Sequence, residues 1–273
     1  MADSPPITLC GSLARHPARL GAAMHGAAYE ALGLAFTYVP FAIDDLAAAI
    51  AAMRALGIRG LGIAVPFKIE VMALVDRLEP LAERIGAVNT VVNDDGLLTG
   101  YNTDAHGAVR ALEEVTSLEG KRILVIGAGG AARAVAHALQ QRGARLHIAN
   151  RTAEKARALA SALGATYGGL DAARRLEGYD IVVNCSSAGM KEYGAASPIP
   201  EQAIFPGLVV MDIVYKPVRT ELVRAAESRG ALTVHGGRML LHQASRQFEL
   251  YTGRAAPLEA MDAALKTQIA LTG

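Results

Sequence analysis

Residues 122–132 read RILVIGAGGAA, and this stretch decides the fold of the second half of the chain. Residues 123–126 form a continuous apolar run, which is typical of a parallel strand buried on both faces. Gly127, Gly129 and Ala132 then follow in the pattern GxGxxG/A, at the head of a predicted helix. A strand, a glycine turn and a helix in this order are the fingerprint of a dinucleotide-binding βαβ unit.

The residue types of this turn match what a pyrophosphate requires. Gly127 permits a tight turn, Gly129 lets the backbone approach the phosphates, and the small Ala132 lets the helix pack closely on the strand. The free N–H groups of the helix N-terminus then face the phosphates. A purely structural turn would contain the same glycines, but the strand, helix and second strand around it favour binding. We therefore predict a cofactor-binding set of Gly127, Ala128, Gly129, Gly130 and Ala131.

The end of the next strand, predicted over residues 145–149, indicates which dinucleotide binds. NAD enzymes place Asp or Glu about 20 residues after the first glycine, where it holds the ribose 2′-OH. Here Asn150, Arg151 and Thr152 occupy that place, with Lys155 one turn later. Arg151 can stack on a 2′-phosphate or bind it with two N–H groups, and Lys155 adds positive charge. Cations at a helix start oppose the helix dipole, so simple solvent exposure does not account for them, and we predict NADP.

The composition excludes several classes of protein. The 273 residues correspond to about two domains. With 27 Lys and Arg against 26 Asp and Glu the formal net charge is +1, so no basic field favours nucleic acid or an anionic membrane. Hydrophobic residues make up 52% of the chain and aromatic residues only 5%, which favours helices packed on aliphatic strands.

The sequence shows no targeting signal and no metal-binding motif. The two cysteines, Cys10 and Cys185, cannot make a disulfide framework, and the seven histidines lack metal-ligand spacing. Residues 1–13 lack the basic and apolar regions of a signal peptide, and no apolar run reaches the ~18 residues that span a bilayer. We therefore expect a cytoplasmic protein with no metal, membrane or nucleic-acid partner.

Short apolar runs alternate with Ala-rich helical stretches along the whole chain, which is typical of an α/β fold with mostly parallel sheets. Strands are predicted at residues 7–11, 35–41, 59–65, 88–93, 97–100, 123–126, 145–149, 180–184, 209–213 and 232–235. Helices are predicted at residues 20–32, 44–56, 104–115, 131–141, 153–163, 218–228, 239–251 and 258–270, with two shorter ones that begin at Phe67 and after Pro80. Residues 186–206 form a long loop, and loops of this length inside a compact domain are usually functional.

Two charged residues lie where strands are predicted to end. Lys68 follows the strand at residues 59–65, and Asp104 begins a helix after the strand at residues 97–100. Ligands of parallel sheets collect at the carboxyl ends of the strands. By spacing alone, however, Lys68 is better explained as a surface lysine and Asp104 as an acid at a helix start.

The order of several short motifs resembles the shikimate dehydrogenase family over nearly the whole chain. The motifs are found at residues 65–68, 87–90, 102–104, 127–132, 150–152, 184–190 and 239–244. The resemblance implies a substrate-binding domain at residues 1–104, completed by C-terminal helices at residues 239–273. It also implies a Rossmann-type NADP domain at residues 105–238, a cleft between the domains, and reversible reduction of 3-dehydroshikimate to shikimate.

The resemblance also assigns roles to single residues. It makes Lys68 the acid/base and Asp104 its partner, where an ammonium group would stabilise a developing alkoxide and supply its proton. It places Ser12, Asn89, Tyr215 and Gln243 at the substrate, which would be a small cyclic hydroxy acid. It places Ser186, Ile213, Gly236 and Met239 at the cofactor.

The first domain departs from the family pattern. Family members carry a Ser-x-Ser-Pro segment after the first strand, whereas this chain has only Ser12 there, followed by Arg15 and Arg19 as candidates for a carboxylate clamp. Gly62 and Ala64 stand where the family has Asn and Thr. The natural substrate could therefore be quinate, an amino-shikimate or another hydroxy acid, or the protein could be a non-catalytic NADP(H)-responsive regulator. A homodimer is also possible.

Overall fold

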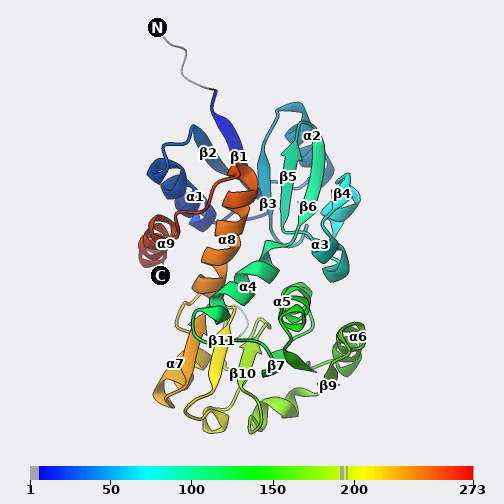
Figure 1. The fold of residues 1–273 in the computed structure, drawn as a ribbon, viewed down its shortest axis with the longest axis vertical. Coiled ribbons are helices and arrows are strands. Elements are labelled where there is room, and N and C mark those ends of the chain that lie inside the picture. Colours follow the sequence, from blue (N-terminus) through cyan, green and yellow to red (C-terminus); the bar gives the residue numbers. More distant parts are fainter. Residues whose placement is uncertain (1–5, 191–193, 195, 273) are drawn as a thin grey trace. The chain divides into compact units, whose positions relative to one another are not determined.

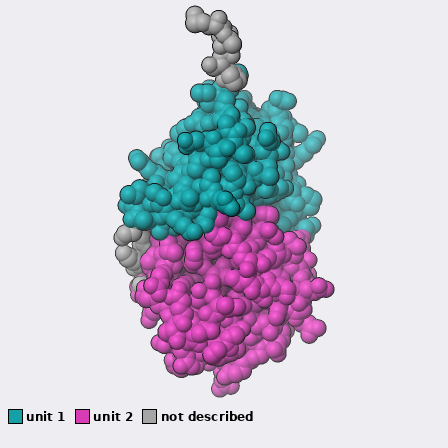
Figure 2. Space-filling view, turned by 60° about the vertical axis from the view of Figure 1, so that its left-hand side comes forward, with its two compact units in different colours: residues 1–103, 243–273 teal, residues 104–242 magenta. Residues whose placement is uncertain are grey.

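The computed structural model describes residues 6–190, 194 and 196–272 and divides the chain into two compact units. Unit 1 comprises residues 1–103 and 243–273, and unit 2 comprises residues 104–242 (Figure 2). The two divisions fall at the start of α4 (Thr103–Glu113) and inside α8 (Gly236–Thr252). Within the described residues, no helix combines the length and the apolar character that crossing a membrane requires.

Unit 1 is built on a six-stranded mixed sheet with the order β2-β1-β3-β5-β6-β4 (Figure 1). Its strands are β1 (Thr8–Ala14), β2 (Phe36–Ala42), β3 (Gly60–Ile63), β4 (Arg77–Leu78), β5 (Thr90–Asp94) and β6 (Leu97–Tyr101). β1 runs parallel to β2 and β3, whereas β5 pairs antiparallel with both β3 and β6. Its helices are α1 (Leu20–Ala31), α2 (Leu46–Ala55), α3 (Pro80–Ile85) and α9 (Leu258–Thr272), and α1 packs against α9.

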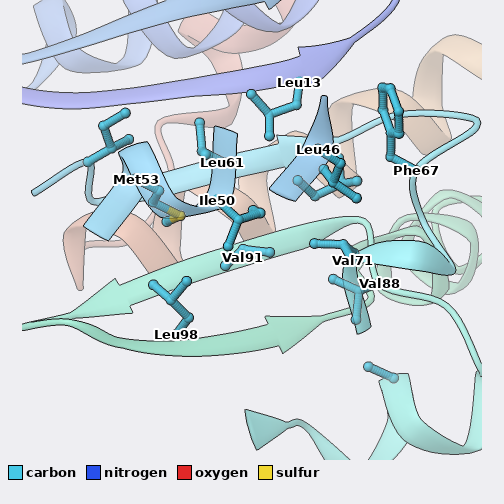
Figure 3. Close-up of a cluster of buried hydrophobic side chains, with 13 residues drawn as sticks. Leu13, Leu46, Ile50, Met53, Leu61, Phe67, Val71, Val88, Val91 and Leu98 are labelled. Atoms are coloured by element: carbon cyan, nitrogen blue, oxygen red, sulfur yellow. The ribbon is translucent and has the colours of Figure 1, made fainter. Parts of the chain in front are cut away.

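A hydrophobic core lies between α2 and the sheet of unit 1 (Figure 3). Leu46, Ile50 and Met53 recur at helical spacing on one face of α2, and all three are buried. They pack in one cluster with Leu61 of β3 and Val91 of β5. The same cluster reaches the segment after β3, so it fixes the end of the strand that precedes Lys68.

Unit 2 is a six-stranded parallel sheet with the order β12-β11-β10-β7-β8-β9. Its strands are β7 (Arg122–Ile126), β8 (Arg145–Ala149), β9 (Thr166–Gly168), β10 (Ile181–Asn184), β11 (Val209–Asp212) and β12 (Leu232–His235). The helices α5 (Gly130–Gln141), α6 (Ala153–Leu163) and α7 (Glu221–Ser228) belong to this unit. The strand order reverses between β7 and β10, and in such sheets the crevice at that reversal is where ligands bind. The α/β fold class with a Rossmann-type second half is thus confirmed.

Three helices start at least three residues from where the sequence predicted. The helix expected over residues 239–251 already begins at Gly236. The helix expected from Phe67 is only a turn followed by the 3-10 helix η1 (Glu70–Ala73), because the chain must return to the sheet at once: the Asp76 N–H donates to Leu98 O, 2.9 Å away. The helix expected over residues 218–228 begins at Glu221, since the Thr220 side chain caps it by accepting the Val223 N–H at 3.2 Å. The short edge strands β4 and β9 were not predicted.

Candidate active site

The glycine turn after β7 has the backbone that its sequence predicted. Gly127 has φ +118°, a conformation that favours glycine, and a Cβ there would lie 3.1 Å from the carbonyl group of Cys185. The Gly127 N–H donates to Ala149 O at 2.8 Å. Gly127 therefore lets the ends of β7, β8 and β10 approach one another closely.

The start of α5 is open in the way that a diphosphate requires. A Cβ on either Gly129 or Gly130 would meet nothing within 4 Å. Gly129 is the N-cap of α5 and offers no side chain to the first N–H groups of the helix. Ala132 is fully buried, which agrees with close packing of the helix on the sheet. A phosphate fits this cradle, since helix N–H groups and the helix dipole both favour an anion.

The predicted 2′-phosphate site lies at the end of β8. The Asn150 amide donates to Thr152 O at 2.9 Å and so shapes the turn that leads into α6. Arg151 and Lys155 are both exposed beside this turn. Their positive charge is available to an anionic group at the carboxyl end of the sheet.

A buried carboxylate connects the loops that follow β10 and β11. Asp212 is fully buried and accepts hydrogen bonds from the Asn184 amide at 2.9 Å, the Thr220 hydroxyl at 2.7 Å and the Val214 N–H at 3.1 Å. Burial raises the pKa of Asp212, and these hydrogen bonds oppose that rise. The side-chain oxygen of Asn184, Oδ1, in turn accepts from the backbone N–H and the hydroxyl of Ser186. One network thus holds both loops.

The remaining predicted cofactor residues belong to the same edge of unit 2. The Ile213 N–H donates to Asn184 O at 3.1 Å, and a Cβ on Gly236 would overlap the carbonyl oxygens of residues 213 and 214. Met239 is buried in the next turn of α8. Gly127, Asn150, Ser186, Ile213 and Gly236 each closely follow a strand of the parallel sheet, so the topology brings them to one edge.

Lys68 and Asn89 are neighbours in unit 1. The Val88 N–H donates to Lys68 O at 2.8 Å, and the Ile63 N–H donates to Asn89 O at 2.7 Å. Lys68 is partly exposed on the turn after β3. Asn89 is buried, and its side-chain oxygen accepts from the Thr103 N–H at 2.7 Å.

Asp104 directly follows Thr103 and lies in the first turn of α4. Its side chain is buried. A carboxylate in the first turn interacts favourably with the positive end of the helix dipole and so stabilises the helix. The predicted catalytic pair is divided between the units, with Lys68 in unit 1 and Asp104 in unit 2. The predicted substrate contacts divide likewise, because Ser12, Asn89 and Gln243 belong to unit 1 and Tyr215 to unit 2.

The departures from the family pattern have a local explanation. Ser12 lies within β1 rather than after it, and it pairs in register with Gly62 of β3. A Cβ on Gly62 would lie 3.1 Å from Gln247 Nε2 and 3.2 Å from the Tyr38 hydroxyl. Other side chains therefore occupy the space beside Gly62. Arg15 and Arg19 are exposed, and their role as a carboxylate clamp stays a prediction.

Several polar residues of the site were not predicted from the sequence. They are Tyr38, Thr90, Thr103, Gln247, Asp212 and Thr220. Only the glycines at alternate positions of β3 could have indicated that side chains from elsewhere approach this strand.

Comparison with known sequences gives three matches along the chain. Residues 16–91 match the shikimate dehydrogenase substrate binding domain, residues 110–197 the shikimate/quinate 5-dehydrogenase domain, and residues 236–266 the shikimate 5′-dehydrogenase C-terminal domain. A curated relative, the shikimate dehydrogenase (NADP(+)) of Methanothermobacter thermautotrophicus, is 44% identical over 254 residues, which cover 89% of this chain and 90% of the relative.

Solved structures are similar over almost the full length. Shikimate 5-dehydrogenase from Thermus thermophilus, in complex with NADP(H) and shikimate, has a TM-score of 0.89 and 35% identity, covering 96% of this chain and 100% of that one. A ligand-free 5-ketofructose reductase from a Gluconobacter species has a TM-score of 0.88 and 31% identity, covering 97% of this chain and 99% of that one.

Proposed function

Because the chain belongs to the shikimate dehydrogenase family, as its sequence motifs indicated, we propose that it catalyses the reversible NADP-dependent reduction of 3-dehydroshikimate to shikimate. The observation that carries this proposal is the pairing of two features in one chain. Unit 2 has an open glycine cradle with cations after β8. In unit 1 the backbone oxygen of Lys68 accepts from the Val88 N–H, and the next residue in the chain is the buried Asn89.

The cofactor site supports NADP. The backbone of Gly129 and Gly130 and the N-terminus of α5 would hold the diphosphate, and Arg151 and Lys155 would hold the 2′-phosphate. Asn150 and Thr152 shape that turn. Ser186, Ile213, Gly236 and Met239 would line the nicotinamide side. NADPH, when bound, supplies the hydride.

Lys68 would transfer the proton, and Asp104 would orient Lys68. As the ring carbonyl is reduced, negative charge develops on its oxygen; the Lys68 ammonium stabilises this charge and donates a proton to the oxygen. In the reverse direction the lysine accepts that proton. Asp104 supplies the countercharge that orients the ammonium group. Asn89 and Gln243 would bind substrate hydroxyls, Ser12 would add one hydroxyl, and Tyr215 would cover the ring.

A second substrate class belongs in the test. The chain has no side chain at Gly62 and carries Ala64 where the family has hydroxyl and amide groups, and the similar reductase from Gluconobacter is named for a different substrate. The second serine of the family's Ser-x-Ser-Pro segment is missing as well. Each lost neutral hydrogen bond costs about 0.5–1.5 kcal/mol, so these three losses would shift substrate preference by orders of magnitude. Quinate, amino-shikimate and 5-ketofructose are therefore the natural competitors of shikimate.

One assay separates these substrates. The purified protein is mixed with NADP and each acid, or with NADPH and 5-ketofructose, and the absorbance of the reduced nicotinamide is followed. The proposal expects the highest kcat/KM with shikimate and NADP. Preference for another substrate would correct the substrate, whereas NADP binding without turnover of any of them would indicate a regulator instead.

We also infer a cytoplasmic location, and the oligomeric state, for which the sequence allows a homodimer, is a matter for measurement. The location is supported by the two buried, unpaired cysteines, Cys10 and Cys185, since oxidising compartments favour disulfides. Cell fractionation tests the location, and sedimentation velocity tests the dimer.

A further inference from the structure

Two glycines of β3 make room for side chains of α8. Gly60 and Gly62 point to the same face of the sheet, because side chains alternate along a strand. A Cβ on Gly60 would overlap the Tyr251 ring, and a Cβ on Gly62 would lie 3.1 Å from Gln247 Nε2. Gln247 and Tyr251 are one helical turn apart, so α8 lays one face along these glycines.

The amide of Gln247 is buried and reaches the strand beyond β3. Its Nε2 donates to the Thr90 hydroxyl at 2.9 Å and lies 3.4 Å from the backbone oxygen of Asn89. A backbone carbonyl only accepts hydrogen bonds, so the nitrogen of the amide must be the atom on this side. Gly62 and Thr90 are direct partners in the β3–β5 register, which places Thr90 next to the space that Gly62 leaves.

The hydrogen bond from Gln247 reaches Asn89 through the Thr90 hydroxyl. The Thr90 oxygen accepts from the Gln247 amide, and its hydroxyl donates to Asn89 Oδ1, 2.8 Å away. The Thr90 hydroxyl also lies 3.1 Å from the Thr103 hydroxyl, where either oxygen can be the donor. The Thr103 N–H donates to the same Oδ1 at 2.7 Å, and this group can only donate. These donors hold the oxygen of the Asn89 amide, so its nitrogen faces the opposite side.

We propose that Gln247 is a positioning residue for substrate binding: through Thr90, and together with the two donors of Thr103, it holds the rotamer of Asn89, the residue that would bind a substrate hydroxyl. This inference rests on the proposed function. Gly62 is part of the arrangement, because the amide from α8 fills the space that a side chain of β3 would need. Gln243, another predicted substrate contact, lies one turn before Gln247 on the same helix, so α8 would carry a contact and its support side by side.

The effect of Gln247 should be specific to the hydroxy acid. Without the amide donor the Thr90 hydroxyl can turn toward the Thr103 hydroxyl, and Asn89 Oδ1 then keeps only the donors of Thr103. The predicted NADP contacts belong to unit 2, whereas Gln247, Thr90 and Asn89 belong to unit 1. A tenfold loss of kcat/KM for the acid, with KM for NADP changed less than twofold, is the expected result for Gln247→Ala.

Variants at Thr90 separate positioning from packing. Thr90→Val removes the hydroxyl at constant shape, and Thr90→Ser keeps it. We expect Thr90→Val to lose as much kcat/KM as Gln247→Ala, Thr90→Ser to stay within threefold of the unaltered protein, and the Gln247→Ala/Thr90→Val double variant to lose no more than either single one. Gln140→Ala, on the exposed side of α5, serves as the matched control.

A rescue variant tests the role of Gly62. In Gln247→Ala, the added change Gly62→Asn would place a new amide in the vacated space next to Thr90. We expect this double variant to recover at least half of the lost kcat/KM. Gly62→Asn alone should lower kcat/KM, because its side chain would compete with Gln247 for the same space.

The outcomes distinguish the inference from the proposed function. Turnover of shikimate by the unaltered protein, with kcat/KM unaffected by both Gln247→Ala and Thr90→Val, would overturn the positioning role alone. So would fully additive losses, or losses that appear equally in KM for NADP. If Gln247→Ala does not fold, the kcat/KM values of Thr90→Val and Thr90→Ser test the positioning role instead, and equal values for the two variants would overturn it. Failure of the unaltered protein to turn over any acid would overturn both.

Discussion

At the scale of single residues, we expect cofactor choice to depend on Arg151. This residue is exposed at the turn before α6, where Asn150 fixes the backbone by its hydrogen bond to Thr152 O. A guanidinium group binds a phosphate with charge-assisted hydrogen bonds, which are about twice as strong as neutral ones. The ribose 2′-OH of NAD offers no such charge.

Replacing Arg151 with Ala should therefore weaken NADP binding by roughly 10- to 100-fold and NAD binding by less than about threefold. Fluorescence titration of the reduced cofactors measures both constants. Arg157→Ala, an exposed change further along α6, is the control. Equal losses for the two dinucleotides would contradict a 2′-phosphate contact.

A second residue, His25, should make stability depend on pH. Its ring is fully buried and stacks on Tyr38 with the ring centres 4.4 Å apart. Burial lowers the pKa of His25 to about 3, an effect that the nearby Gln247 amide offsets only in part. The unfolded chain binds a proton at this ring below pH ~6.5 and the folded chain does not, so the free energy of unfolding falls as the pH falls from 6.5 toward 3.

The expected slope from this residue is about 1.4 kcal/mol per pH unit within that window. His25→Phe keeps an aromatic ring in the stack and should remove this part of the pH dependence. Urea unfolding between pH 4 and pH 7 measures it. Identical slopes for the variant and the unaltered protein would rule out a buried neutral His25.

At the scale of elements, the start of α7 determines how firmly the loop after β11 is held. Thr220 accepts the Val223 N–H and donates to Asp212, so one hydroxyl both caps a helix and satisfies a buried carboxylate. Loss of a cap costs about 1 kcal/mol, and a buried acceptor left without a donor costs about 1–3 kcal/mol.

Thr220→Val should therefore lower the free energy of unfolding by about 2–4 kcal/mol, whereas Thr220→Ser should stay within about 1 kcal/mol of the unaltered protein. Urea unfolding at pH 7 gives both values. If the valine variant were as stable as the serine variant, the hydroxyl would contribute nothing to this loop.

The long, strongly patterned elements were predictable from the sequence, and the short ones were not. β7 is predicted by its apolar run, and α2 by the helical spacing of Leu46, Ile50 and Met53. By contrast, β4 has two residues and β9 three, and both lie at sheet edges where pairing with a distant strand defines them. The helix expected from Phe67 failed because its segment is tied back to β6 through Asp76.

At the scale of the whole molecule, the proposed cofactor contacts belong to unit 2, and most of the proposed substrate contacts belong to unit 1. The glycine turn of unit 2 was predictable because strand, turn and helix are contiguous in sequence. The proposed contribution of Gln247 to the support of Asn89 was not, because the two residues are 158 positions apart. Contacts of that kind depend on how α8 packs on β3, and the sequence marks them only by the glycines that leave room.

Because the NADP contacts are assigned to unit 2 and the acid/base Lys68 to unit 1, the two roles should be separable by one substitution. Lys68→Ala in the full chain tests this most directly, with kcat for shikimate oxidation and the Kd of NADP measured on the same preparation. We predict that kcat falls by roughly 100-fold or more, since general acid–base catalysis contributes about 10²–10⁴-fold, while the Kd of NADP stays within about threefold. A variant that keeps a tenth of the original rate would contradict the assignment of Lys68 as the acid/base.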